Sequence, residues 1–315
     1  YSNKVSKKTM TAITDDILSS GIKSKENEWV FGGKILGQNS DNKNEFYGRN
    51  LHEVDGGKSE VKVDSNISGA YAYGEYGLKS NASLGFVVGG TKSSTDISGN
   101  SKLKGNSISI LSYAKKDINN LQLKAGIGYQ HSFYDSTRTV SNAYQSMSVK
   151  KEYKDNAFNM FGGAKYSYFL GKEIYVEPYF NVIFSYVNQD EINEENNQSL
   201  TMSVKKKSFN SLDTETGIDL VKKLNLSKGE LKLKVGTSLM YAIDGYENEY
   251  LTGKINGATK DFEILSAESD RTRAKIKTSM EYELENGISY NINGEYITSS
   301  KNKDYKVGIG IGYKF

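Results

Sequence analysis

Apolar and polar residues alternate with a period of two along most of this chain. From residue 121 onwards, Leu121, Leu123, Ala125, Ile127 and Tyr129 share one parity, while polar or small residues occupy the other. Successive side chains of a β-strand point to opposite faces, so the segment predicts a strand with one apolar and one polar face. The same pattern recurs at 173 to 187 and, with a charged second face, at 273 to 284.

About twelve such segments can be counted, each roughly as long as the 9 to 11 residues that a tilted strand needs to cross a bilayer. They are 28 to 38, 65 to 79, 82 to 94, 104 to 117, 119 to 134, 155 to 170, 173 to 188, 207 to 223, 228 to 244, 270 to 285, 287 to 299 and 303 to 315.

The connections between these segments are alternately short and long. The long polar loops are 39 to 64, 95 to 103, 135 to 154, 189 to 206 and 245 to 269. Outer-membrane barrels have short periplasmic turns and longer extracellular loops, and an even strand count leaves both barrel ends on the periplasmic side. We therefore predict an all-β fold, a transmembrane antiparallel up-and-down barrel of twelve strands.

The alternation also predicts which way individual side chains point. Ile127, Val182, Ile276 and Ile309 are expected to meet lipid, whereas Lys124, Glu177, Arg273, Lys275 and Lys277 are expected to face the lumen. Further cations predicted on the lumen wall are Lys165, Lys232, Lys234 and Arg271, and further anions are Glu75, Asp213, Glu215, Asp219 and Glu281.

Composition agrees with a barrel and excludes other classes. The net charge is only +3 from 41 basic and 38 acidic residues, and no dense basic block suggests nucleic-acid binding. The mean hydropathy is −0.59, and no apolar stretch reaches the roughly 18 residues of a transmembrane helix. A strand that alternates apolar and polar residues averages to such a value. With no cysteine, disulfides and thiolate metal sites are not expected.

Three sequence features resemble a known family. The last strand, 305 to 315, alternates aromatic or aliphatic residues with Gly and Lys and ends on Phe315, which resembles the signature that the outer-membrane insertion machinery recognises. The stretch 280 to 296 resembles the closing hairpin of the autotransporter β-domain family, and Val176-Glu-Pro-Tyr179 resembles its mid-barrel strand. Pro178 within that strand predicts a bulge or a gap in pairing. The Lys- and Asn-rich composition suggests a fusobacterial-type member.

The resemblance implies a helix that threads the pore, at residues 2 to about 20. We expect a helix and linker at 1 to 22 and one barrel domain at 23 to 315. The helix would carry Lys4, Lys7, Lys8, Asp15 and Asp16, and the two aspartates would meet lumen cations.

The resemblance also implies a function and partners. The barrel would anchor and export a passenger polypeptide upstream of residue 1, since no secretory signal is visible at Tyr1 and the numbering would begin inside a precursor. The expected partners are outer-membrane lipid and lipopolysaccharide, the barrel-assembly machinery, for which Tyr313 and Phe315 would be the signal, and the chain's own passenger. The protein would be a monomer without a cofactor.

Two other functions remain open from sequence. One is a porin or specific channel, and the other is a surface adhesin that acts through loops 39 to 64 and 245 to 269. Catalysis is not expected: His131 and Ser132 are adjacent, so they would point to opposite faces of a strand, and His52 lies among acidic residues in a long loop. The helix holds a single asparagine, Asn3, so autocleavage at paired asparagines is disfavoured. No catalytic, cofactor-binding or metal-ligating residue is predicted.

Overall fold

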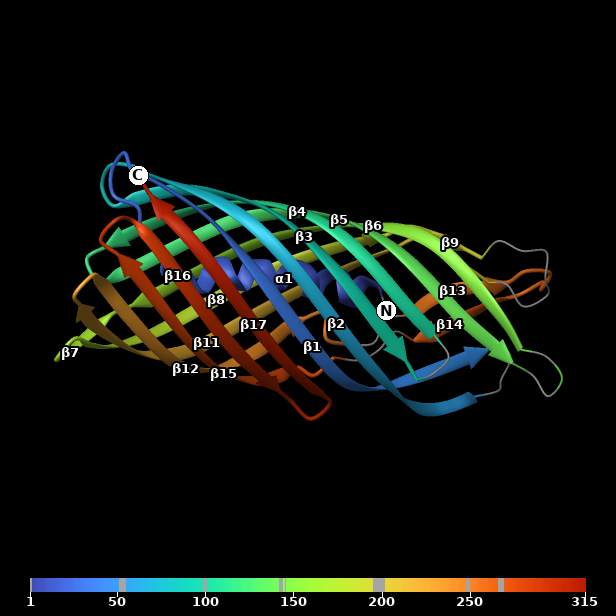
Figure 1. Ribbon diagram of the computed structural model, residues 1–315. Helices are drawn as coiled ribbons and strands as arrows, with labels where there is room; N and C mark the ends of the chain where they lie inside the picture. The colour runs from blue at the N-terminus through green and yellow to red at the C-terminus, as the bar shows by residue number, and fades with distance from the viewer. Residues whose placement is uncertain are drawn as a thin grey trace.

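A single β-sheet closes on itself around one helix in the computed structural model of the chain (Figure 1). The structure describes residues 2–50, 55–98, 101–141, 144, 146–194, 202–247, 250–265 and 269–315. Every pairing between named strands is antiparallel.

The barrel has twelve strands, the sixth of which is interrupted. In order around the wall they are β1 (Trp29–Asn50), β2 (Asp55–Gly77), β3 (Ala82–Ile97), β4 (Ser101–Ile118), β5 (Leu121–Ser141), β6 (Ser146–Tyr166) with its continuation β7 (Tyr168–Gly171), β8 (Ile174–Gln189), β11 (Lys207–Leu226), β12 (Gly229–Asp244), β15 (Thr272–Leu284), β16 (Ile288–Thr298) and β17 (Asn302–Lys314). The wall is closed by β1 and β17, which pair from Val30↔Lys314 to Asn42↔Asn302. The predicted fold is confirmed.

One end of the barrel is built from tight turns. Residues in the left-handed region make two of them, with φ of 62° and 56° at Ser80 and Asn81 and of 54° at Asn119. Such φ values are uncommon outside glycine and are most tolerated by residues such as asparagine. Both ends of the barrel chain meet here: the backbone N–H of Trp29 donates to Phe315 O, and that of Phe315 donates to Trp29 O, each at 2.9 Å.

At the opposite end the strands continue well beyond the predicted boundaries. Loop 39 to 64 is largely the extended hairpin of β1 and β2, and loop 135 to 154 is largely the ends of β5 and β6. The loops at 189 to 206 and 245 to 269 contain short strands, β9 (Ile192–Asn193), β10 (Met202–Val204), β13 (Tyr250–Ile255) and β14 (Asp261–Leu265), which pair with one another and with β1. The predicted strand boundaries were wrong because they were placed where the apolar alternation ends. The strands continue past that point, since backbone pairing does not require an apolar face.

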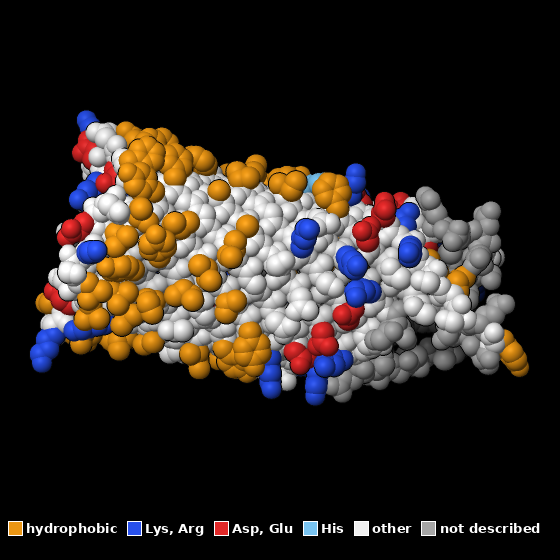
Figure 2. All heavy atoms as spheres, in the orientation of Figure 1, with side chains coloured by type: hydrophobic (Ala, Val, Ile, Leu, Met, Phe, Trp, Pro, Cys, Tyr) orange, Lys and Arg blue, Asp and Glu red, His pale blue; other side chains and the backbone are white. Residues whose placement is uncertain are grey.

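Apolar side chains form a belt on the outside of the wall. Figure 2 shows them gathered over the half of the barrel nearest the tight turns, with charged side chains beyond them towards the other end. Exposed members of the belt include Phe86, Ile110, Ile127, Met160, Leu239 and Ile309. Among the described residues, no helix has the length and apolar character needed to span a membrane.

Pro178 lies opposite the interruption of the sixth strand. Pairing of β6 with β8 stops at Lys165↔Tyr179 and resumes as β7 at Tyr168↔Val176. Proline has no backbone N–H to donate to a neighbouring strand. The gap between β6 and β7 therefore lies opposite the residue that could not donate a hydrogen bond. The predicted break in pairing is confirmed.

The helix α1 (Ser2–Ser19) lies inside the barrel (Figure 1). Its apolar side chains, Val5, Met10, Ile13, Ile17 and Leu18, are all buried against the wall. Ser2 contacts Gln189 at the long-loop end of β8, whereas the linker after α1 contacts Lys115 near a tight turn. The helix therefore runs from the long-loop end of the barrel to the tight-turn end, and the predicted helix in the lumen is confirmed.

Candidate functional site

The lumen around α1 holds most of the buried polar contacts, and its centre is Asp16. The ammonium of Lys306 lies 2.7 Å from Asp16 Oδ1, and that of Lys34 lies 3.2 Å from Oδ2. Tyr71 OH donates to Oδ2 at 3.1 Å. These partners come from the adjacent strands β17, β1 and β2. Two cations and a hydroxyl thus compensate a carboxylate that is almost fully buried, which a desolvated charge requires. We call this group the Asp16 clamp.

Lys124 closes the C-terminal end of α1. Its ammonium donates to the carbonyl oxygens of Ile17, Leu18 and Ser20, at 3.2, 3.0 and 2.7 Å. The last carbonyls of a helix have no partner within the helix and carry the negative end of its dipole. The Lys124 ammonium therefore donates hydrogen bonds to these carbonyl oxygens and also compensates the negative end of the helix dipole.

The linker after α1 is held by a second buried ion pair. Lys115 Nζ lies 2.6 Å from Glu75 Oε1 and also donates to the carbonyl of Ile22 at 2.7 Å. Tyr113 and Ser24 donate to the same Glu75 carboxylate at 3.0 and 2.9 Å. The path from α1 to β1 is thereby fixed to the inner wall at the tight-turn end.

One face of α1 bonds to the wall through hydroxyl groups. Ser6 Oγ donates to Asp155 at 2.7 Å and contacts Tyr134 OH. Gln130 Nε2 donates to Ser6 O and Thr9 Oγ1, at 3.0 and 2.8 Å. Sequence reasoning missed this face because it weighed only charged residues. The signal that could have found it is the spacing of Ser2, Ser6 and Thr9 by four and three, which places them on one side of a helix.

The three predicted lysines of α1 lie towards the long-loop end. Lys7 forms a 2.7 Å ion pair with Asp213, Lys8 lies 3.5 Å from Asp304, and Lys4 donates to Ser269 Oγ at 2.9 Å. Partly exposed pairs of this kind contribute at most about 1 kcal/mol each. Asp15, next to the clamp, forms no hydrogen bond or ion pair with any residue that the structure describes.

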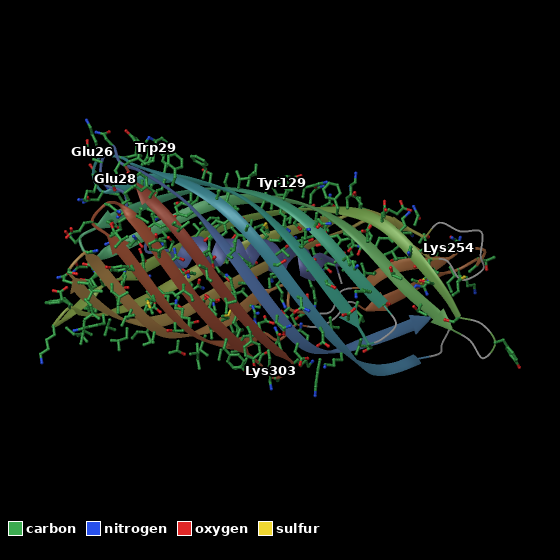
Figure 3. All side chains as sticks on the ribbon, viewed as in Figure 1. Glu26, Glu28, Trp29, Tyr129, Lys254 and Lys303 are labelled. Atoms are coloured by element: carbon green, nitrogen blue, oxygen red, sulfur yellow. The ribbon has the colours of Figure 1, made fainter. Side chains whose placement is uncertain are left out.

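The structure places the residues predicted to face lipid on the outer surface. Ile127, Ile276 and Ile309 are 60%, 64% and 55% exposed, and Val182 is half-buried. Trp29 and Tyr129 project outward from the wall in Figure 3.

The residues predicted to face the lumen line it together with acidic partners. Lys275 lies 2.9 Å from Glu215, Lys277 lies 3.2 Å from Asp219, and Glu177 accepts from Ser167. Lys124 is in the helix cap described above, and Arg273 borders a cavity beside α1.

The prediction for Arg271 was wrong. Its guanidinium lies over the rings of Tyr241 and Tyr246, at 4.7 and 4.6 Å from their centroids, and Arg271 is exposed. β15 begins only at Thr272, so the strand parity that would turn Arg271 inward does not apply to it.

His131 and Ser132 lie on opposite sides of the barrel wall. The ring of His131 lies on the outer side, edge-on to Phe133 and 2.5 Å from Asn156 Oδ1, whereas Ser132 is fully buried on the inner side. His52 lies outside the described residues. Among the residues that the structure describes, no group of three or more His, Asp or Glu could hold a metal ion.

The arrangement as a whole makes α1 a plug in the lumen. Hydrogen bonds and ion pairs hold α1 to β1, β2, β5, β6, β8, β11 and β17. A cavity of about 160 Å³ lies between the helix and parts of β11, β12, β15 and β16. None of the pairings between the described strands involves α1, so the wall closes without the helix.

Comparison with known proteins links this architecture to one family. A family model described as the autotransporter beta-domain matches residues 45–295. The translocator domain of the autotransporter NalP from Neisseria meningitidis superimposes with a TM-score of 0.71 at 14% identity, covering 99% of this chain and 95% of that one. No curated protein sequence matches the chain.

Two further solved structures share the fold. The beta domain of the Bordetella autotransporter BrkA gives a TM-score of 0.61 at 14% identity, covering 90% of this chain and 99% of that one. The transport unit of the autotransporter AIDA-I from Escherichia coli gives 0.59 at 16% identity, covering 99% and 98%.

Proposed function

The chain belongs to the autotransporter β-domain family, and we propose that α1 is the last part of an exported polypeptide, held in the pore after export. The barrel is the outer-membrane anchor and translocator domain for an attached passenger. The long-loop end is extracellular, and the tight turns and both ends of the barrel chain are periplasmic.

The observation that carries the proposal is the direction of α1. The helix enters the lumen at the long-loop end and leaves it at the tight-turn end, where the linker joins β1. Polypeptide that precedes Ser2 would therefore emerge on the extracellular side while remaining covalently joined to the barrel. A porin does not need a polypeptide that crosses its pore and is joined to the barrel. We therefore favour the translocator.

The lumen contacts support specific roles in the proposal. Residues 1–22 act as pore helix and linker, and 23–315 act as the anchor. Lys4, Lys7, Lys8 and Asp16 hold the helix, and the lumen-facing set (Lys124, Glu177, Arg273, Lys275 and Lys277) forms the polar surface against which it rests. Asp15 forms no hydrogen bond or ion pair with a described residue, although Lys275 and Lys306 lie near it, so neutralising it should leave the Asp16 clamp intact.

Further partners also belong to the proposal. The barrel-assembly machinery would read the last strand through Tyr313 and Phe315. Lipopolysaccharide would meet the outward lysines just beyond the apolar belt, such as Lys92, Lys104 and Lys154. The domain would work as a monomer, without a cofactor and without catalytic activity of its own.

An epitope fused ahead of Tyr1 tests the proposal. In intact cells of a Gram-negative host, an antibody should label this epitope. The matched control carries the same epitope in the tight turn at Ser80 and Asn81, where labelling should require permeabilised cells. If the epitope ahead of Tyr1 were labelled only after permeabilisation, the translocator reading would be wrong.

A further inference from the structure

A second cavity lies beside the C-terminal end of α1, on the periplasmic side of the lumen. Its volume is about 100 Å³, and residues 19–22 close it against the inner faces of β1, β12, β15 and β16. Four lysines line it: Lys34, Lys232, Lys234 and Lys277. We call it the lysine cavity.

Lys234 is the unusual member of this group. It is only 8% exposed, yet its ammonium makes no hydrogen bond or ion pair with any described residue. Its charged neighbours are the cations Lys124, Lys165, Lys232 and Lys277 and the carboxylates Asp219 and Glu177. A buried ammonium without a hydrogen-bond partner is costly, and the four like charges increase that cost.

The carboxylates of the cavity are largely committed elsewhere. Asp219 lies 3.2 Å from Lys277 and 3.9 Å from Lys165. Asp16 is bound within its clamp, and Glu295 lies among Lys275 and Lys306. Glu281 also lines the cavity and lies beside Lys232, its cross-strand neighbour: a side chain added at Gly21 would meet Glu281 Oε2 at 3.0 Å and Lys232 Nζ at 3.1 Å. A local excess of positive charge is therefore left at Lys234.

We propose that the lysine cavity binds a small oxyanion of the phosphate class, held by Lys234 and Lys232. The cavity, at about 100 Å³, is several times the roughly 10–15 Å³ that a single water requires, which is room for a small tetrahedral oxyanion. Asn291 and Asn293 also line it, and a side-chain amide can donate through its NH2 group. The bound ion supplies the negative charge that the protein does not.

The site exists only while α1 is in the lumen, because residues 19–22 form one of its walls. A ligand that binds the plugged barrel and not the open one stabilises the plugged state by mass action. The bound anion thus stabilises α1 in the lumen after export. This role goes beyond the anchoring and export of a passenger, which would stand without it.

Phosphate titration of the refolded full chain in detergent micelles tests the site. Calorimetry should detect binding of inorganic phosphate, and the melting temperature should rise in phosphate relative to sodium chloride at equal ionic strength. Lys234→Met should weaken phosphate binding at least tenfold and remove the rise. The matched control is Lys222→Met, since Lys222 lies on the same half of the barrel but donates to the carbonyl of Lys172 outside the lumen. It should bind phosphate as the unaltered chain does.

Three results would overturn the proposal: no phosphate binding by the unaltered chain, an equal rise in sodium chloride, or unchanged binding by Lys234→Met. If Lys234→Met does not refold, Lys232→Met replaces it and must weaken binding by the same criterion. Surface labelling of the epitope ahead of Tyr1 is independent of all these outcomes, so failure of the anion site and failure of the translocator are distinguishable.

Discussion

At the scale of single residues, Lys124 and Ile127 show how far sequence reasoning reaches. They lie three positions apart on β5, and Lys124 is 6% exposed whereas Ile127 is 60% exposed. Strand parity predicts the face of each side chain. It does not predict that Lys124 caps the carbonyls of Ile17, Leu18 and Ser20, because that depends on the depth and rotation of a helix far away in sequence.

An arginine at Ile127 should destabilise the folded barrel in lipid by about 2–4 kcal/mol, because its guanidinium would lie in the apolar belt. Urea unfolding in lipid vesicles, followed by Trp29 fluorescence, measures this difference. Ile127→Leu is the control and should cost less than about 1.5 kcal/mol. A spin label at this position that reported water contact would show that the register is wrong.

At the scale of elements, the contrast between α1 and the strand extensions is informative. The helix was predictable from the resemblance to the autotransporter β-domain family, with which the sparse apolar positions of residues 2 to 20 and the following Gly21 agree. The extracellular halves of β1, β2, β5 and β6 were not, since their sequences do not alternate an apolar with a polar face. The pairing of β14 with β1 could not have been predicted from local pattern at all.

The Asp16 clamp should be the main fastener of α1. Asp16→Asn should lower the free energy of unfolding by about 3 kcal/mol, because Lys306 and Lys34 would be left buried without their counter-charge. Asp15→Asn removes the same charge from the adjacent position and should have little effect. Chemical denaturation of both variants measures the difference, and equal effects would mean that the clamp does not hold the helix.

Asp270 joins the long-loop connection before β15 to the turn between β16 and β17. Ser299 Oγ, Ser300 Oγ and the N–H of Lys301 donate to its carboxylate at 2.5, 2.9 and 2.8 Å. Partial burial raises the pKa of Asp270, but these hydrogen bonds outweigh it, so its pKa lies below the ordinary value. A depressed pKa means that the bonds stabilise the fold above the ordinary carboxyl pKa and are lost as the pH falls through the folded-state value.

Hydrogen exchange at the Lys301 amide should report this directly. Its protection factor should fall as the pH drops below the folded-state pKa of Asp270. In Asp270→Asn the protection should be lower at neutral pH and nearly independent of pH. A pH-dependent protection factor in that variant would assign the titration to another group.

At the scale of the whole molecule, closure of the wall explains how a sequence this polar can lie in a membrane. Each barrel strand has a neighbour on both sides within the described residues, so backbone groups in the lipid are paired without an open edge. The wall and its approximate strand count were predictable from sequence. The lumen contacts were not, because each joins residues that are far apart along the chain.

Phe315 should matter more for assembly than for the finished barrel. Its ring stacks on Phe31 and Tyr313, with centroids 5.5 and 5.7 Å away, and it is 62% exposed. Phe315→Ala should therefore cost little stability, about 1 kcal/mol, and should refold in micelles, but insert poorly into the outer membrane of living cells. Equal insertion of both chains would contradict its role as the assembly signal.

In the proposed translocator, α1 closes a pore that would otherwise conduct ions. A twelve-stranded barrel is wider than the eight-stranded kind that wall side chains alone can fill. Single-channel conductance in planar bilayers, for the full chain and for a version that begins at Gly21, is the most direct measurement. We expect small or flickering currents from the full chain and larger, steadier currents from the shortened one. Identical large conductances from the two would show that the helix does not plug the pore and would favour a porin instead.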